Sequence, residues 1–146
     1  MVRWGKCDFK QLKKLQKRLE RLEKADLDAF SRQMVGQLAA RMLAKVIKRT
    51  PVGVYPPGSG KTGGILRRGW TVGPVIKKGD MYEIEIINPV YYAAYVEFGH
   101  RTASHSGWVP GRFMMTISEQ ELERDAPKII EKALVKRLQE VFDGGK

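Results

Sequence analysis

Residues 70–87 read WTVGPVIKKGDMYEIEII, and this stretch has the pattern of a β-hairpin. Apolar and charged side chains alternate over 81–87, which predicts a strand with one buried and one solvated face. Lys78-Gly79-Asp80 is typical of a tight hairpin turn. The apolar residues before it predict the first strand, with β character beginning at residue 65. An interruption is expected at Gly73-Pro74, because proline has no amide hydrogen for the ladder.

Two helical patterns precede the hairpin. Leucines at 3–4 spacing predict a helix over 8–24, and a second apolar stripe continues to about Arg49. The second stripe ends at Thr50-Pro51, since the residue before a proline disfavours helix. Two helices with a short break and one long bent helix both fit this pattern. The leucines of the first stripe are Leu12, Leu15, Leu19 and Leu22, with Phe9 extending it.

The pattern after the hairpin is mixed. Residues 90–98 (VYYAAYVEF) favour a short helix over a strand, residues 99–112 predict a polar loop, and residues 113–117 predict a strand. Ser118 followed by Glu121 has the spacing of a capping box. The last helix is therefore expected to begin there, with Pro127 as a kink or a restart.

These patterns together predict an α+β protein. We expect a long N-terminal helical segment, a small twisted antiparallel sheet, and a C-terminal helix packed on that sheet. The 146 residues fit a single domain. Its expected parts are a helical arm (1–50), a flexible loop (51–64), a β-rich core (65–117) and a C-terminal helix (118–142).

Composition excludes several classes of protein. No apolar run approaches the roughly 18 residues that a membrane span needs. The single cysteine, Cys7, cannot form an internal disulfide or hold a zinc ion alone, and it fits a reducing cytosol. The net charge of +11 is uneven: residues 1–80 hold 19 basic and 6 acidic residues, whereas residues 81–146 hold 8 and 10. This asymmetry indicates either a solvated helix surface or one basic face that meets phosphate or an acidic partner.

Two motifs resemble sites of chemistry, but neither predicts an enzyme. The string Pro57–Thr62 (PGSGKT) resembles the end of a P-loop, but Tyr55 stands where that motif needs glycine, and no strand precedes the string. His100 and His105 lie five residues apart without a thiolate or carboxylate in ligand spacing, although Glu97 could support His100 as an acid–base pair. We therefore expect no catalytic residue, no metal and no cofactor.

Several strings in order resemble one family. They are Arg49–Val52 (RTPV), Thr62–Trp70 (TGGILRRGW), Tyr92–Arg101 (YAAYVEFGHR) and Trp108–Met114 (WVPGRFM). In this order, after a basic helical N-terminus, they look like the phage tail-component family typified by the gene-product-ten protein of lambdoid siphophages. Members of that family run TPVDTG, whereas here nine further residues, Gly53–Lys61, intervene. The P-loop lookalike is then a loop insertion.

The resemblance implies a function without a reaction. Proteins of this family are virion components of the neck or tail-completion region, also found in prophages and phage-tail-like particles. The chain is therefore expected to form a six-fold homo-oligomeric ring that joins the head connector to the tail terminator or tail tube. It would be assembled in the bacterial host cytoplasm and remain in the virion. A basic lumen would tolerate passing DNA without reading its sequence.

The resemblance also implies a set of contact residues. The expected subunit-interface residues are Trp70, Tyr92, Tyr95, Glu97 and Phe98. The expected charged contacts to a neighbour or to DNA are Arg67, Arg68 and Arg112. Further apolar contact surface is expected from Trp4, Phe9 and the leucines at the N-terminal end. The alternative function is a basic accessory protein that binds DNA without sequence specificity, since aromatic residues lie beside arginines at Trp70 and Trp108.

Overall fold

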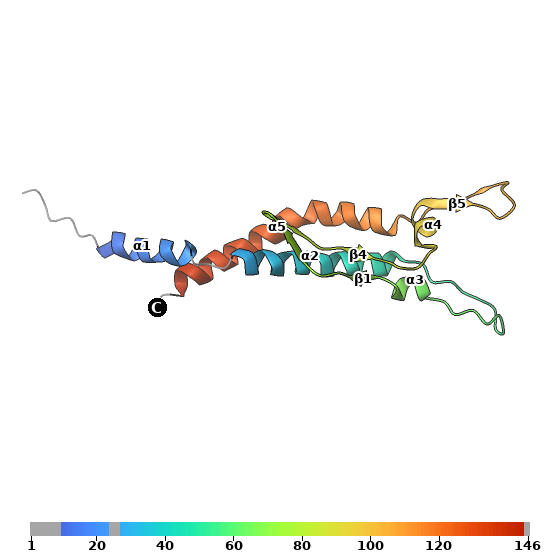
Figure 1. Ribbon diagram of the computed structural model, residues 1–146, viewed down its shortest axis with the longest axis horizontal. Coiled ribbons are helices and arrows are strands. Elements are labelled where there is room, and N and C mark those ends of the chain that lie inside the picture. Colours follow the sequence, from blue (N-terminus) through green and yellow to red (C-terminus); the bar gives the residue numbers. More distant parts are fainter. Residues whose placement is uncertain (1–9, 24–26, 145–146) are drawn as a thin grey trace, which may run out of the picture.

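The computed structural model describes residues 10–23 and 27–144 (Figure 1). Trp4, Cys7 and Phe9 lie outside the described residues. The helices are α1 (Lys10–Glu23), α2 (Leu27–Arg49), α3 (Ile65–Arg68), α4 (Ala93–Phe98) and α5 (Met114–Asp143). The strands are β1 (Thr71–Val72), β2 (Ile76–Lys78), β3 (Met81–Glu83), β4 (Ile86–Ile87), β5 (Gly99–Arg101) and β6 (Trp108–Pro110). The predicted α+β class is confirmed.

An antiparallel pair of long helices, α2 and α5, forms the body of the molecule (Figure 1). The apolar positions of α2 recur at helical spacing, so one face can be buried along the length of the helix. Met34, Ala39, Met42 and Val46 are the buried residues of α2, and Met114 is buried at the start of α5. The core is therefore a narrow seam between two helices.

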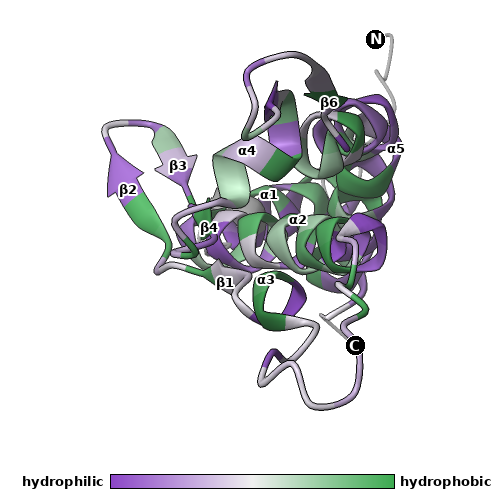
Figure 2. Cartoon of the chain, turned by 90° about the vertical axis from the view of Figure 1, so that its right-hand side faces the viewer, coloured by the Kyte–Doolittle hydropathy of each residue, from purple (hydrophilic) through white to green (hydrophobic). Residues whose placement is uncertain are grey.

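The predicted hairpin is present as a two-stranded ribbon over residues 71–87. β1 pairs with β4 and β2 pairs with β3, both antiparallel. Gly79, at φ +60°, takes the first central position of the turn, where the left-handed region suits glycine. Figure 2 shows the β2–β3 end of the ribbon projecting to one side of the α2–α5 pair.

A bulge divides the ribbon at the predicted interruption. Val72 pairs with Ile86, but Ile76 pairs with Glu83, so residues 73–75 oppose only residues 84–85. One extra residue in one strand defines a β-bulge, which bends the ribbon and raises its twist. The small sheet expected from the sequence is therefore a bent ribbon together with a separate hairpin, β5–β6.

Four local predictions are wrong. Residues 65–68 begin the expected β-rich region but form the short helix α3, and the expected polar loop 99–112 contains the paired strands β5 and β6. Residues 113–117 are not a strand, because α5 begins at Met114. Ser118 is therefore inside the helix, where its hydroxyl donates to the Met114 carbonyl instead of capping a new N-terminus. The helix also continues through Pro127 without a restart.

The chain exposes much more surface than a compact protein of its size. Its accessible surface is 11718 Å², whereas a compact monomer of 16.6 kDa exposes about 7,600 Å². The fourteen residues outside the described part, even if fully extended, would account for only about 2,300 Å² of that excess of about 4,100 Å². The described residues alone therefore leave an unusually large surface uncovered.

Candidate assembly interface

Thr50 is the centre of a polar junction at the end of α2. It is fully buried, and its hydroxyl donates to the Val46 carbonyl at 2.6 Å. The same hydroxyl accepts a hydrogen bond from the Trp70 indole at 2.7 Å. Arg67 donates twice to the Thr50 carbonyl, at 3.0 and 2.6 Å. Two of the strings that suggested a family, RTPV and TGGILRRGW, therefore meet at one residue.

Asn88 ties the end of the ribbon to the same junction. Its side-chain amide donates to the Leu66 carbonyl at 2.8 Å, and its side-chain oxygen accepts from the Val90 amide at 3.1 Å. Leu66 itself is buried. Because Asn88 follows β4 directly, these bonds fix the direction in which the chain leaves the ribbon for α4.

Glu97 caps the N-terminus of α5. The carboxylate is buried, and it accepts hydrogen bonds from the Met115 and Thr116 amides, both at 2.9 Å, and from the Thr116 hydroxyl at 2.7 Å. The first amides of a helix have no partner within the helix, and the helix dipole favours negative charge there. Glu97 thus supplies from α4 the cap that residues next to α5 do not supply.

Charged side chains also join α2 to α5. Arg49 and Lys45 both pair with Glu121, and Arg49 donates to the Ser118 hydroxyl at 3.2 Å. The hydrogen bond from Lys45 holds the pKa of Glu121 below its ordinary value, and the charge of Arg49 adds to that effect although partial burial opposes it. Glu121, expected to close a capping box, instead locks the two helices together.

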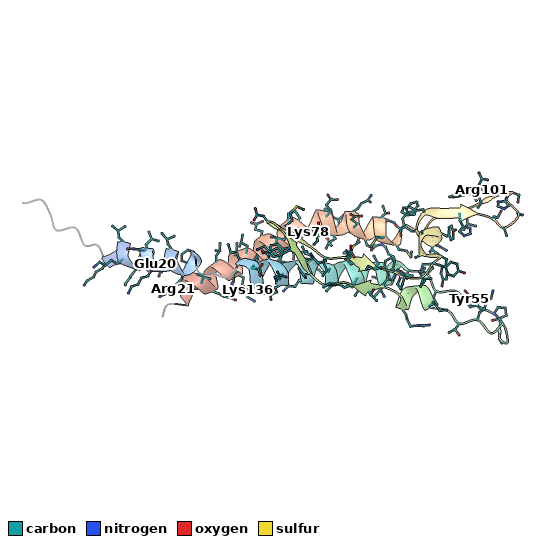
Figure 3. All side chains as sticks on the ribbon, viewed as in Figure 1. Glu20, Arg21, Tyr55, Lys78, Arg101 and Lys136 are labelled. Atoms are coloured by element: carbon teal, nitrogen blue, oxygen red, sulfur yellow. The ribbon has the colours of Figure 1, made fainter. Side chains whose placement is uncertain are left out.

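Two projections extend from the junction end of the molecule, and together we call them the fork. One is the loop 51–64, and the other is the β5–β6 hairpin (99–110). Figure 3 shows Tyr55 on the first projection and Arg101 on the second, at the same end of the chain. The fork, helix α4 and the short segments that flank α4 and β6 carry the exposed aromatic side chains of the described residues. These are Tyr55, Tyr91, Tyr95, Phe98, Trp108 and Phe113.

The fork carries positive charge without acidic neighbours in sequence. Between Thr50 and Gly79, and again between Phe98 and Ser118, the chain has no aspartate or glutamate. Lys61, Arg68, Arg101 and Arg112 are exposed there. Arg68 lies 3.4 Å from the Gly63 carbonyl, and Lys61 lies over the Tyr55 ring at 5.7 Å. Such a surface suits an acidic protein face or a phosphate backbone.

The structure brings the expected interface residues together in two groups. Trp70, Glu97 and Phe98 line one hollow of about 300 Å³, whereas Tyr92 and Arg112 line another of about 350 Å³ at the base of the fork. Tyr95 is 57% exposed and meets the His100 ring edge-on, with centroids 6.0 Å apart.

The expected contact residues differ in whether their side chains are bonded within the chain or exposed. Arg67, Trp70 and Glu97 have their polar groups bonded inside the chain, so they hold the junction. Tyr95, Phe98, Arg68 and Arg112 are exposed.

The structure adds a polar cluster that sequence reasoning missed. The Tyr82 hydroxyl donates to Asp28 at 2.7 Å, and Arg32 and Lys77 pair with the same carboxylate at 2.8 and 3.4 Å. The Tyr82 hydrogen bond, followed by that of Arg32, lowers the pKa of Asp28 to about 2. This cluster ties the ribbon to the start of α2. Only the Asp28–Arg32 spacing is visible in sequence, as an i, i+4 pair.

The P-loop lookalike lies in the exposed loop 51–64, between the end of α2 and the four-residue helix α3. A phosphate-binding loop follows a strand and opens a longer helix, and the described residues place neither beside Lys61.

His100 forms a hydrogen bond with the neighbouring Arg101 carbonyl, and His105 has a positive φ of 56°. Within residues 10–23 and 27–144, no three histidine, cysteine or carboxylate side chains gather as a metal site would require. No described helix has the length and apolar character to cross a bilayer.

Comparison with known proteins gave one family match. A family model described as "Bacteriophage HK97-gp10, putative tail-component" matches residues 13–99, which is more than half of the chain. The match includes the leucine-rich helix from residue 13 onward, the RTPV and TGGILRRGW strings, the ribbon and α4. Searches of curated proteins and of solved structures gave no match.

Proposed function

The chain belongs to the HK97-gp10-like family of bacteriophage tail components, and from that membership we propose that it is a structural subunit of a neck or tail-completion ring. It would associate with copies of itself, six in the family-based expectation, and join the head connector to the tail terminator or tail tube. Its role would be to supply contact surfaces in the virion and not to catalyse a reaction.

The observation that supports self-association most strongly is the uncovered surface. The accessible surface of the chain is about half as large again as that of a compact monomer of its mass. Isolated exposed apolar residues are ordinary, but large apolar patches usually mark protein interaction sites. Tyr91, Tyr95, Phe98 and Trp108 are 88, 57, 63 and 60% exposed and lie close together in sequence. Aromatic side chains of this kind dominate the energetics of interfaces.

The first experiment measures assembly directly. Light scattering after size-exclusion chromatography and negative-stain images of the purified protein should show a concentration-dependent ring. Phe98→Glu should weaken ring formation and incorporation into tails. Met81→Glu is the matched control, because Met81 is 66% exposed at the ribbon turn, away from the fork. A persistent wild-type monomer that is absent from purified particles would contradict the proposal.

A second candidate function, non-specific DNA contact, is favoured by the acid-free sequence of the fork. Basic side chains that neutralise phosphates release counterions, so affinity falls as salt rises. Filter binding across a salt series should give a steep dependence for the isolated monomer if this is its function. Changing Arg101 and Arg112 together to glutamine should then reduce the slope of log affinity against log salt concentration by about two. Equal slopes for the variant and the wild type would remove this candidate.

A further inference from the structure

We propose that α1 of one copy of this chain docks in the groove between the ribbon, α2 and α5 of a second copy. The proposal deepens the assembly role given above and rests on it. It names the two surfaces that meet: the stripe formed by Leu12, Leu15 and Leu19, and the groove described below.

The leucine stripe is exposed in the single chain. Leu12, Leu15 and Leu19 are 57, 48 and 47% exposed. Figure 1 shows α1 projecting at the end of the molecule opposite to the fork, and its packing within the chain is against α5. A helix of fourteen residues is marginal alone in water, and most of its stability comes from burying its apolar face.

The groove is apolar and lies between three elements. Its volume is about 560 Å³. The floor is contributed mainly by α2, with Val35 and Leu38 half-buried and Ala39 and Met42 buried. The walls are Ile84 and Ile86 from the ribbon and Met115 and Leu122 from α5.

The groove and the stripe match in length. Leu12 to Leu19 spans seven residues, and Val35 to Met42 along the floor also spans seven, which is about 10.5 Å of helix in each case. An amphipathic helix recognised by a groove uses anchors at i, i+3 and i+7, and the three leucines have this spacing.

The two surfaces also match in charge. Glu83, Glu85 and Glu119 line the groove and are exposed at its rim. Arg18, at i+3 from Leu15, lies beside the leucine stripe on α1. Opposite charges around an apolar contact favour the correct pairing and speed association. The charge asymmetry of the sequence, with a basic N-terminal half and an acidic C-terminal half, then has a structural reason.

Docking between copies follows from the placement of the two surfaces. α1 lies at one end of the molecule (Figure 1), whereas the groove lies along the middle of α2. Two different patches on one subunit make a heterologous contact, which closes into a ring if the rotation between subunits permits. The other occupant of the groove is the same chain's own α1, folded back on α2, and the experiments below distinguish it.

A pair of single substitutions tests the stripe. Leu15→Ser should weaken self-association of the full-length chain at least about tenfold in sedimentation velocity, since burial of one leucine contributes about 1.5–3 kcal/mol. Lys17→Ser, on the opposite face of α1, is the matched control and should leave association unchanged. Equal association of Leu15→Ser and wild type, with equal helix content by circular dichroism, would overturn the proposal.

A mixing experiment tests whether two different surfaces meet. One variant carries Leu12→Ser, Leu15→Ser and Leu19→Ser, and the other carries Glu83→Lys, Glu85→Lys and Glu119→Lys at exposed positions. Each alone should associate more weakly than wild type, because each lacks one half of the contact. An equal mixture should recover association, because the intact α1 of one variant meets the intact groove of the other. A mixture that associates no better than the separate variants, or either variant assembling alone as wild type does, would overturn the proposal.

Crosslinking separates docking between copies from docking within one chain. With Cys7→Ser as background, Leu15→Cys and Leu38→Cys are joined by a short bis-maleimide in the full-length chain. A ladder of covalent oligomers supports docking between copies. An internally linked monomer, or no link, would overturn it.

The experiments distinguish a failure of the α1 docking proposal from a failure of the proposed tail role. If Leu15→Ser assembles and enters tails as wild type does, the docking proposal fails while the tail role stands. If wild type itself is absent from tails, the tail role fails whatever α1 contacts.

Discussion

At the scale of single residues, three buried polar side chains organise the junction end of the molecule: Thr50, Glu97 and Ser118. Glu97 accepts from first-turn amides of α5 that the helix itself leaves unpaired, whereas the Thr50 and Ser118 hydroxyls each donate to the carbonyl four positions earlier. Sequence patterns predicted the end of α2 at Thr50 correctly, because the following proline acts locally. They missed the start of α5, because its cap comes from Glu97, which lies 18 positions before Met115. Local spacing cannot reveal a cap of that kind.

Glu97→Ala should destabilise the fold by about 2–3 kcal/mol, since it removes charge-assisted bonds to two first-turn amides of α5 at half-buried residues. Urea unfolding followed by circular dichroism measures this. Glu119→Gln, an exposed change in the same part of α5, is the control and should stay within about 0.5 kcal/mol. An unfolding free energy for Glu97→Ala equal to that of the control would show that Glu97 does not cap α5.

Thr50→Val should cost about 1–3 kcal/mol, because the Trp70 indole would lose its acceptor in a buried site. The change conserves shape, so the loss reflects the missing hydroxyl. The control is Thr62→Val, which is exposed in the loop. Blue-shifted Trp70 fluorescence together with the lower stability would confirm the broken bond, and unchanged stability would contradict it.

At the scale of elements, the ribbon is held to the helical body at both ends. Asn88 fixes one end at the junction, and Asp28 fixes the other through Tyr82 and Lys77. The alternating pattern over 81–87, the glycine turn and the interruption at Gly73-Pro74 predicted the ribbon itself. The attachment to Asp28 was not predictable, because Asp28 and Tyr82 lie 54 positions apart and no pattern in the sequence links them.

The attachment of the ribbon should depend on pH. The pKa of Asp28 is lowered from 3.8 to about 2, so the carboxylate stabilises the contact above about pH 4, and this stabilisation is lost as pH falls through about 2. The Tyr82 ring resonances in an NMR titration should report that loss. Asp28→Asn should remove the dependence, whereas Asp80→Asn in the turn of the same ribbon should retain it. A titration of Asp28→Asn identical to wild type would contradict the assignment.

The inserted part of the loop 51–64 should be dispensable for folding. A Cβ atom on Gly63 would clash with the Gly53 carbonyl oxygen, so the two limbs of the loop meet at their base. Deleting Gly53–Lys61 should change the unfolding free energy by less than about 1 kcal/mol, because loop entropy varies slowly with length. Incorporation into tails should fall. A glycine-serine loop of the same length separates the effect of length from that of sequence, and a large loss of stability would contradict the geometry.

At the scale of the whole molecule, the chain is a long helical pair with projections and a narrow core. Sequence patterns and the family resemblance predicted the class and the order of its main elements. Periodicity reports which face of an element is apolar, but it does not report whether that face is covered by the same chain. The family resemblance pointed to the leucines of α1 and to Tyr95 and Phe98 as contact residues, and the structure adds how far each of them is exposed in the single chain.

The narrow core predicts a shallow denaturation curve for the isolated subunit. The unfolded chain would expose about 24,000 Å² of accessible surface, and the folded chain exposes 11718 Å². The difference is the area that unfolding uncovers. It is about three quarters of the area that unfolding would uncover in a compact protein of this length. The urea m-value should be lower by the same fraction, because it scales with exposed area. Measurements in dilute solution check this, and an m-value typical of a compact 146-residue protein would contradict it.

The large uncovered surface has a consequence for infected cells. A subunit that has not joined a particle opens more readily than one that has, because partners that bind only the folded state add to its stability. Host proteases degrade chains in proportion to the time those chains spend open. Surplus copies are therefore expected to be cleared while incorporated copies persist, so that the supply of this component adjusts itself to the number of tails under construction.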